Sequence, residues 1–241
     1  MSEVPTESPV TLLPREVRLV VERILLLTTV PHGLIPAVRD VVLYSAAAGL
    51  GGLPLLRRRF ADLRAAETVA PRITEISPSH LAVDAGGGHA WVALPMILDA
   101  LGDAVAREGA ALAEVTNLRD PEELRTASAY APREGLSVFV ADAATLPAGL
   151  GTITLTAAPS TAGDAVLERA LREGVVVEPA LWWDLHHLSN TALSTDTPES
   201  RRHAGPVIVE ADGRVTGRTD HDDDTDLSLL TSAKPESANA H

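Results

Sequence analysis

The chain has 241 residues, of which 45% are hydrophobic and only 3% aromatic, so we expect one or two domains whose core consists of Ala, Leu and Val. A formal net charge of −13 with a single lysine, Lys234, argues against a nucleic-acid surface, which needs clustered basic side chains. The absence of cysteine excludes disulfides and thiolate chemistry. An acidic N-terminus, MSEVPTESPV, and the lack of a run of ~20 apolar residues predict a cytoplasmic protein without a signal peptide or membrane span.

The N-terminal part of the chain predicts three helices. Residues 1–11 are polar and are expected to form a flexible leader. A helix begins at Pro14, where the first turn tolerates proline, and ends before Pro31. A second helix runs from Pro36 to Gly49, and a third covers residues 55–67 after the breaker Gly51-Gly52-Leu53-Pro54.

The central segment, residues 80–115, predicts a βαβ-like unit. A short apolar run around Leu81–Val83 reads as a strand, and three glycines then supply a tight turn. From Ala93 the apolar residues recur every three or four positions, as on one face of a helix, until Gly109. Residues 111–115 form the next strand, so this helix is expected to pack on a small sheet.

The rest of the chain continues the mixed pattern. Asn117–Asp120 and Pro121 predict a capped helix that ends near Arg133. Further strands are expected at 136–141 and 152–156, with threonines of the second facing solvent, and helices at 165–172 and 180–190. The predicted fold class is therefore α/β (mixed α+β), as one domain over residues 12–210. Residues 211–241 are acidic and are expected to be a largely disordered tail.

Two groups of residues could bind an anion. Gly86, Gly87 and Gly88 could bring backbone amides to a phosphate at a helix start, but GGGH lacks the spaced glycines of a dinucleotide site and the Lys-Ser/Thr of a P-loop. A structural turn is favoured. Arg57, Arg58 and Arg59 could clamp a small carboxylate, whereas a solvated helix face explains them more simply. Arg201 and Arg202 are a second basic pair with the same potential role.

No metal site is predicted. His186 and His187 in WWDLHH are adjacent, so on a helix they point ~100° apart and cannot both ligate one ion. Asp184 and His187 could make one polar contact. The aspartates at 220–226 lack the central glycine and final glutamate of a calcium loop, and a solvated acidic run is the better interpretation.

Leu81–Val140 and the later stretch ALREGVVVEPALWWDLHHL resemble the type-2 malate/L-lactate dehydrogenase family, which includes cyclic-imine reductases. The resemblance implies a dehydrogenase scaffold, a dimer and an NAD(P) cofactor. The family's Asp-Ser-His-Gly motif would fall after Gly49, where this chain has Leu-Gly-Gly-Leu, so the catalytic histidine is absent. Of the family's Asn-Ser-Asn-His segment only Asn117 remains, and the middle portion that supplies much of the cofactor domain has no counterpart.

A second resemblance covers most of the chain and is to a shorter bacterial domain family of unknown function. It rests on HGLIPAVRDVVLYSAAAGLGGLPLL, ALWWDL, TPESRRHAG and the aspartate-rich ending. This family implies no activity.

Together these features predict a non-catalytic or accessory protein that binds a partner subunit or a small metabolite and holds no cofactor. The partner would be a second copy or a catalytic homologue, with one of Trp182 and Trp183 in the core and the other at the interface. The alternative is an NAD(P)-dependent oxidoreductase acting on a small 2-oxo, 2-hydroxy or imino acid. It would use His89 as proton donor, with Asn117 as a second catalytic candidate and Arg57–Arg59 or Arg201–Arg202 holding the carboxylate. A purely structural subunit is a third possibility.

Overall fold

The computed structural model describes residues 8–66, 69–141, 151–193, 207–209 and 215–217. The chain divides into two compact units, residues 1–193 and 194–241. The second unit contains one described feature, an antiparallel pair of strands β8 (Val207–Val209) and β9 (Val215–Gly217). The domain boundary expected at 210 and most of the expected tail lie outside the described residues.

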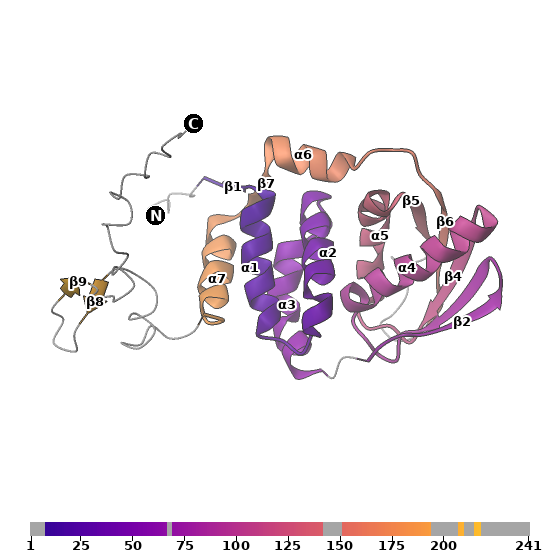
Figure 1. Ribbon diagram of the computed structural model, residues 1–241, viewed down its shortest axis with the longest axis horizontal. Coiled ribbons are helices and arrows are strands. Elements are labelled where there is room, and N and C mark those ends of the chain that lie inside the picture. Colours follow the sequence, from indigo (N-terminus) through magenta and orange to yellow (C-terminus); the bar gives the residue numbers. More distant parts are fainter. Residues whose placement is uncertain (1–7, 67–68, 142–150, 194–206, 210–214, 218–241) are drawn as a thin grey trace, which may run out of the picture. The chain divides into compact units, whose positions relative to one another are not determined.

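The first unit combines helices with two sheets, which confirms the mixed α/β class (Figure 1). Its helices are α1 (Pro14–Leu26), η1 (His32–Leu34), α2 (Ile35–Ala47), α3 (Gly52–Ala65), α4 (Ala90–Glu108), η2 (Pro121–Thr126), α5 (Ala127–Tyr130), η3 (Ala131–Glu134), α6 (Ala165–Glu173) and α7 (Pro179–Asn190). Its strands are β1 (Val10–Leu12), β2 (Arg72–Ser77), β3 (His80–Asp84), β4 (Ala111–Thr116), β5 (Leu136–Ala141), β6 (Ile153–Pro159) and β7 (Val175–Val177).

One half of this unit is helical. Helix α1 contacts α2 and α7, and α2 contacts α3 (Figure 1). The buried face of α1 includes Val17, Val20, Val21 and Ile24, whose spacing the sequence predicted. Gly52 lets α3 approach α2 closely, because a Cβ atom there would collide with the α2 backbone.

The other half is a five-stranded sheet in the order β2-β3-β4-β6-β5. Strands β3 and β4 are parallel neighbours in the sheet, and helix α4 connects them in the sequence. This confirms the predicted βαβ unit. The remaining neighbours are antiparallel. Helix α4 covers one face of the sheet, and its Trp91 is among the largest fully buried side chains. A continuous hydrophobic core joins the sheet half to the helical half.

Several boundaries differ from the sequence predictions. The expected leader ends in strand β1, which pairs with β7 far along the chain, and neither strand was predicted. Strand β2 was also missed. Helix α3 begins at Gly52, because Pro54 falls in its first turn and does not break it. The helix expected after Pro121 is a series of short 3₁₀ and α turns.

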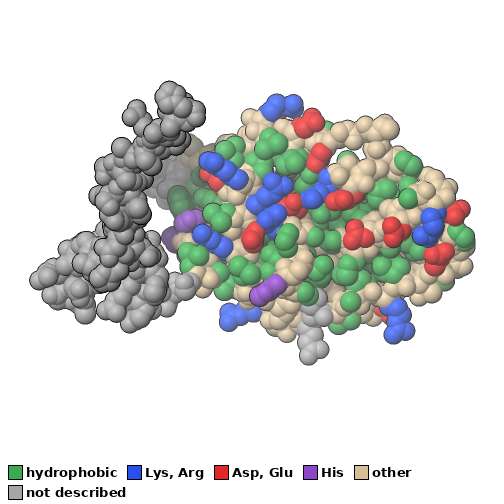
Figure 2. Space-filling model, in the orientation of Figure 1, with side chains coloured by type: hydrophobic (Ala, Val, Ile, Leu, Met, Phe, Trp, Pro, Cys, Tyr) green, Lys and Arg blue, Asp and Glu red, His purple; other side chains and the backbone are tan. Residues whose placement is uncertain are grey.

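Acidic and basic side chains are interspersed on the face that carries α1, α2 and α4 (Figure 2). Many of them are paired, as in the contacts of Asp40 with Arg18, Arg39 and Arg133. Among the described helices, none has both the length and the apolar character needed to cross a bilayer.

Candidate functional site

The parallel strands β3 and β4 end side by side, and the polar residues that follow them meet there. Asp84, the last residue of β3, accepts hydrogen bonds from the Gly86 amide at 2.9 Å and from the side-chain amide of Asn117 at 3.2 Å. These two bonds hold the pKa of the Asp84 carboxyl below its usual value. Asn117 has a φ of +53°, which its short amide side chain tolerates. The sequence candidate Asn117 therefore positions a loop.

The glycine turn uses its own amides. The Gly86 amide donates to Asp84, the Gly87 amide to the carbonyl of Asn117 at 2.7 Å, and the Gly88 amide to the carbonyl of Ala85 at 2.8 Å. Gly86 and Gly87 both have positive φ, which explains the glycines. All three amides that could have approached a phosphate already have acceptors. This geometry fits the structural turn that the sequence analysis favoured.

His89 follows this turn and caps helix α4. Its Nδ1 accepts the amide hydrogen of Trp91 at 3.1 Å, so the proton of the neutral ring is on Nε2. Burial, with Arg119 and Arg59 nearby, lowers the pKa of His89 to about 3. The imidazole is therefore neutral at physiological pH. Its side chain is only 1% exposed, which gives it no contact with a substrate in solution.

Two carboxylates face the other side of this ring. Nε2 of His89 lies 3.4 Å from Oε2 of Glu123 and 3.5 Å from Oδ2 of Asp120. Arg59 of α3 binds the opposite oxygens, with Nη2 2.6 Å from Oδ1 of Asp120 and Nε 3.2 Å from Oε1 of Glu123. Burial raises the pKa of Glu123 to about 7, although Arg59 opposes the shift.

The three facing atoms of this cluster have no hydrogen-bond partners. They are Nε2 of His89, Oδ2 of Asp120 and Oε2 of Glu123, and each is buried. Ligand atoms of these three residues all lie within 4.8 Å of one another. Among the described residues this is the one group of His and acidic side chains arranged so that they could surround an ion.

The arginine triplet does not converge on one ligand. Arg57 pairs with Asp184 of α7, whereas Arg59 is held in the His89 cluster. Arg58, between them, is exposed. Arg201 and Arg202 lie outside the described residues. The candidate carboxylate clamp is therefore not assembled from Arg57–Arg59.

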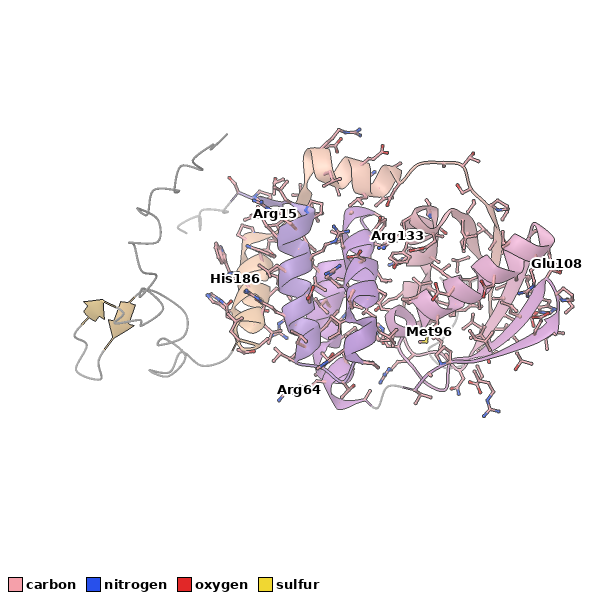
Figure 3. All side chains as sticks on the ribbon, viewed as in Figure 1. Arg15, Arg64, Met96, Glu108, Arg133 and His186 are labelled. Carbon is pink, nitrogen blue, oxygen red and sulfur yellow. The ribbon has the colours of Figure 1, made fainter. Side chains whose placement is uncertain are left out.

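Asp184 of α7 does not join the two histidines of that helix in one cluster. Asp184 binds Arg57 and not His187, and His186 lies near the side-chain amide of Asn190. Helix α7 is at the far end of the helical half from the sheet (Figure 3). Trp182 is 7% exposed and Trp183 is 50% exposed, which confirms that one tryptophan enters the core and the other does not.

The sequence analysis missed the grouping of His89 with Asp120 and Glu123. Asp120 occupies the predicted N-cap position, before η2, but it has a φ of +54° and its side chain makes no cap hydrogen bond. A signal was present, because the glycine turn ending at His89 and the Asn117–Asp120 turn follow two neighbouring parallel strands. Residues after such strands meet at the same edge of the sheet.

No family model matches the chain, and no curated protein matches its sequence. Among solved structures, a dehydrogenase from Sinorhizobium meliloti superposes with a TM-score of 0.53 at 13% identity, over 76% of this chain and 100% of that one. A malate dehydrogenase from Pyrococcus horikoshii OT3 has a TM-score of 0.45 at 14% identity, over 57% of this chain and 41% of that one. A sulfolactate dehydrogenase from Methanocaldococcus jannaschii has a TM-score of 0.44 at 14% identity, over 54% of this chain and 40% of that one.

The fold therefore resembles that of dehydrogenases, as the first sequence resemblance implied. This chain spans about two fifths of the length of the Pyrococcus and Methanocaldococcus enzymes. None of the comparisons supports the second resemblance, to the shorter bacterial domain family.

Proposed function

We propose that this chain is a non-catalytic accessory protein on a dehydrogenase-like scaffold, and that it binds a partner subunit through the outer face of its five-stranded sheet. The observation that carries the proposal is the character of that face. Along β4, β5 and β6, buried residues alternate with exposed or half-buried ones, so one face packs on the core and the other does not.

The outer face carries an exposed aromatic residue in a hollow that is lined by uncharged side chains. Phe139 of β5 lies beside Thr156 of β6, which in turn lies beside Leu112 of β4. Phe139 is 68% exposed, although a large aromatic side chain is usually covered. A hollow of about 500 Å³ is lined by these three residues together with Ser79, Ala110, Ala111, Ser137, Ala157 and Ala158. Uncharged side chains around an aromatic residue are typical of the centre of an interface.

We propose that the chain is not catalytic because its candidate catalytic side chains are already bonded to other protein groups. Proton transfer to a 2-oxo acid needs a donor within hydrogen-bond reach of the substrate. His89 is buried and bonded to the start of α4, and the nearby Arg59 is committed to three carboxylates, those of Asp120, Glu122 and Glu123. Asn117 is bonded to Asp84. The alternative, an NAD(P)-dependent oxidoreductase, would need other residues for each of these roles.

We propose a second copy of the chain as the partner, and a catalytic homologue is the other outcome. Sedimentation velocity of the full chain with Phe139→Glu tests the assignment, because a charge at the centre of an apolar interface is costly to bury. We expect the dimer to dissociate at micromolar concentration. Leu171→Glu on α6 is the matched control, since Leu171 is similarly exposed, at 58%, but lies on another element.

An unchanged dimer with Phe139→Glu, or equal dissociation with Leu171→Glu, would show that the sheet face is not the interface. Circular dichroism of both variants checks that they remain folded.

A further inference from the structure

We propose that His89, Asp120 and Glu123 form a buried site for one divalent transition-metal ion of the zinc class, which ties the start of α4 to η2. This inference is independent of the proposed accessory function. It rests on three side chains from two separate segments whose potential ligand atoms face one another.

The distances between the ligand atoms suit a small ion. Zinc binds imidazole nitrogen and carboxylate oxygen at about 2.0–2.2 Å. Nε2 of His89 lies 3.4 Å and 3.5 Å from the two carboxylate oxygens. Two ligands about 2.1 Å from a common metal and this far apart subtend an angle of roughly 110°, which is the tetrahedral value that zinc prefers. The two separations from His89 Nε2 therefore need little adjustment. The two carboxylate oxygens, which lie within 4.8 Å of each other, need to be no more than about 4.2 Å apart to reach the same ion.

The same atoms are unsatisfied without an ion. The side chains of His89 and Glu123 are 1% and 0% exposed, so water does not reach them from outside. Separations of 3.4 and 3.5 Å are too long for good N–H···O hydrogen bonds. Buried polar atoms are nearly always paired, and three unpaired atoms that face one point need an explanation. A bound ion would satisfy all three.

Charge and ligand type narrow the choice of ion. Two carboxylates and one bound arginine, Arg59, give the cluster a net charge of −1 when Glu123 is ionised. Arg119 adds positive charge nearby, which weakens binding of any cation without occupying a ligand atom. A nitrogen ligand disfavours Mg²⁺ and Ca²⁺, which prefer oxygen alone, and favours zinc.

Binding requires one change of protonation at His89. Its Nε2 proton must leave, and in a neutral imidazole that proton moves to Nδ1. Nδ1 then no longer accepts from the Trp91 amide, so the ring turns slightly and that amide loses its bond. His89 and Glu123 are buried and the side chain of Asp120 is only 10% exposed, so protein nearly encloses the site, and its three side chains supply three of the four ligands that zinc prefers. We therefore expect loading during folding.

The test compares the full chain refolded from guanidinium with one equivalent of Zn²⁺ and with EDTA. After gel filtration, elemental analysis should find about one zinc per chain, and the zinc-loaded protein should melt at a higher temperature. The backbone amide resonance of Trp91 should shift on loading, which zinc on a surface histidine would not cause.

Variants separate this site from other histidines. Glu123→Gln keeps the size of the side chain and should reduce retained zinc at least tenfold, and Asp120→Asn serves if that variant does not fold. The matched control is Glu114→Gln, because Glu114 lies 3.4 Å from His80 in a partly exposed pair with no second carboxylate. Zinc retention that Glu123→Gln and Asp120→Asn leave unchanged, or no retention by the natural chain, would overturn the proposal.

Discussion

The two halves of the first unit differ in two ways, in whether their buried polar atoms have hydrogen-bond partners and in how much apolar surface they expose. In the helical half, the buried carboxylate of Asp40 is bonded by Arg18, Arg39 and Arg133, so both of its oxygens have partners. In the sheet half, His89 faces two carboxylates across gaps too long for hydrogen bonds, and the outer sheet face carries an exposed Phe139. Both of the proposals above therefore place binding in the sheet half.

The opposite charge balance of the two clusters shows in their pKa values. Burial alone would raise the pKa of Asp40, but hydrogen bonds from Arg18 and Arg133 outweigh it, and the net shift is downward. For Glu123 burial outweighs the single arginine, and its pKa rises. The charge of Asp40 is thus fully balanced by three arginines. Asp120 and Glu123 share Arg59, so their negative charge is not fully balanced and could attract a cation.

The largest effect on stability should come from removing the charge of Asp40, which pairs with three arginines. Asp40→Asn leaves three arginines without their shared anion, and we expect a loss of about 3 kcal/mol in the free energy of unfolding, measured by urea titration. Each arginine is partly exposed, which places the estimate at the lower end of the range for buried pairs.

Glu22→Gln is the control, because Glu22 pairs with Arg39 alone and its side chain is 44% exposed, against 7% for Asp40. It should cost less than about 1 kcal/mol. Equal losses in the two variants would remove the distinction between a buried tie and a surface pair.

A second prediction concerns acid. The pKa of Asp40 is depressed in the folded state, so its contribution to stability is complete above its unfolded value, near 3.8. It is lost as the pH falls through the lower folded value. The difference between the urea midpoints of the natural chain and Asp40→Asn should therefore shrink as the pH falls below 3.8. A constant difference from pH 7 to pH 2.5 would contradict the assignment.

Local patterns predicted much of this fold, because helix faces such as Val17–Ile24 and the β3–α4–β4 unit repeat with the period of their own element. Strands β1 and β7 were not predicted, because Val10 pairs with Val177 and residues so far apart in the sequence share no local pattern. The His89 cluster escaped for the same reason, since Arg59 reaches it from α3. Asp120 was assigned to a cap because a polar residue before proline normally serves there.

The smallest effect should come from Trp183 on α7. The sequence predicted the more exposed tryptophan as an interface anchor, and Trp183 is that residue. Because the exposed sheet face lies in the other half of the unit, we expect Trp183→Ala to weaken association by about 1 kcal/mol or less. Analytical ultracentrifugation over a dilution series measures this. A loss as large as that caused by Phe139→Glu would move the interface to the helical half.

The most direct test of the accessory role is the mass of the natural chain in solution. Sedimentation equilibrium at micromolar concentration, alone and with a catalytic dehydrogenase homologue, separates the outcomes. The account predicts a dimer of twice the 25.3 kDa chain mass, or a heterodimer with the homologue. A species of 25.3 kDa under both conditions would contradict it.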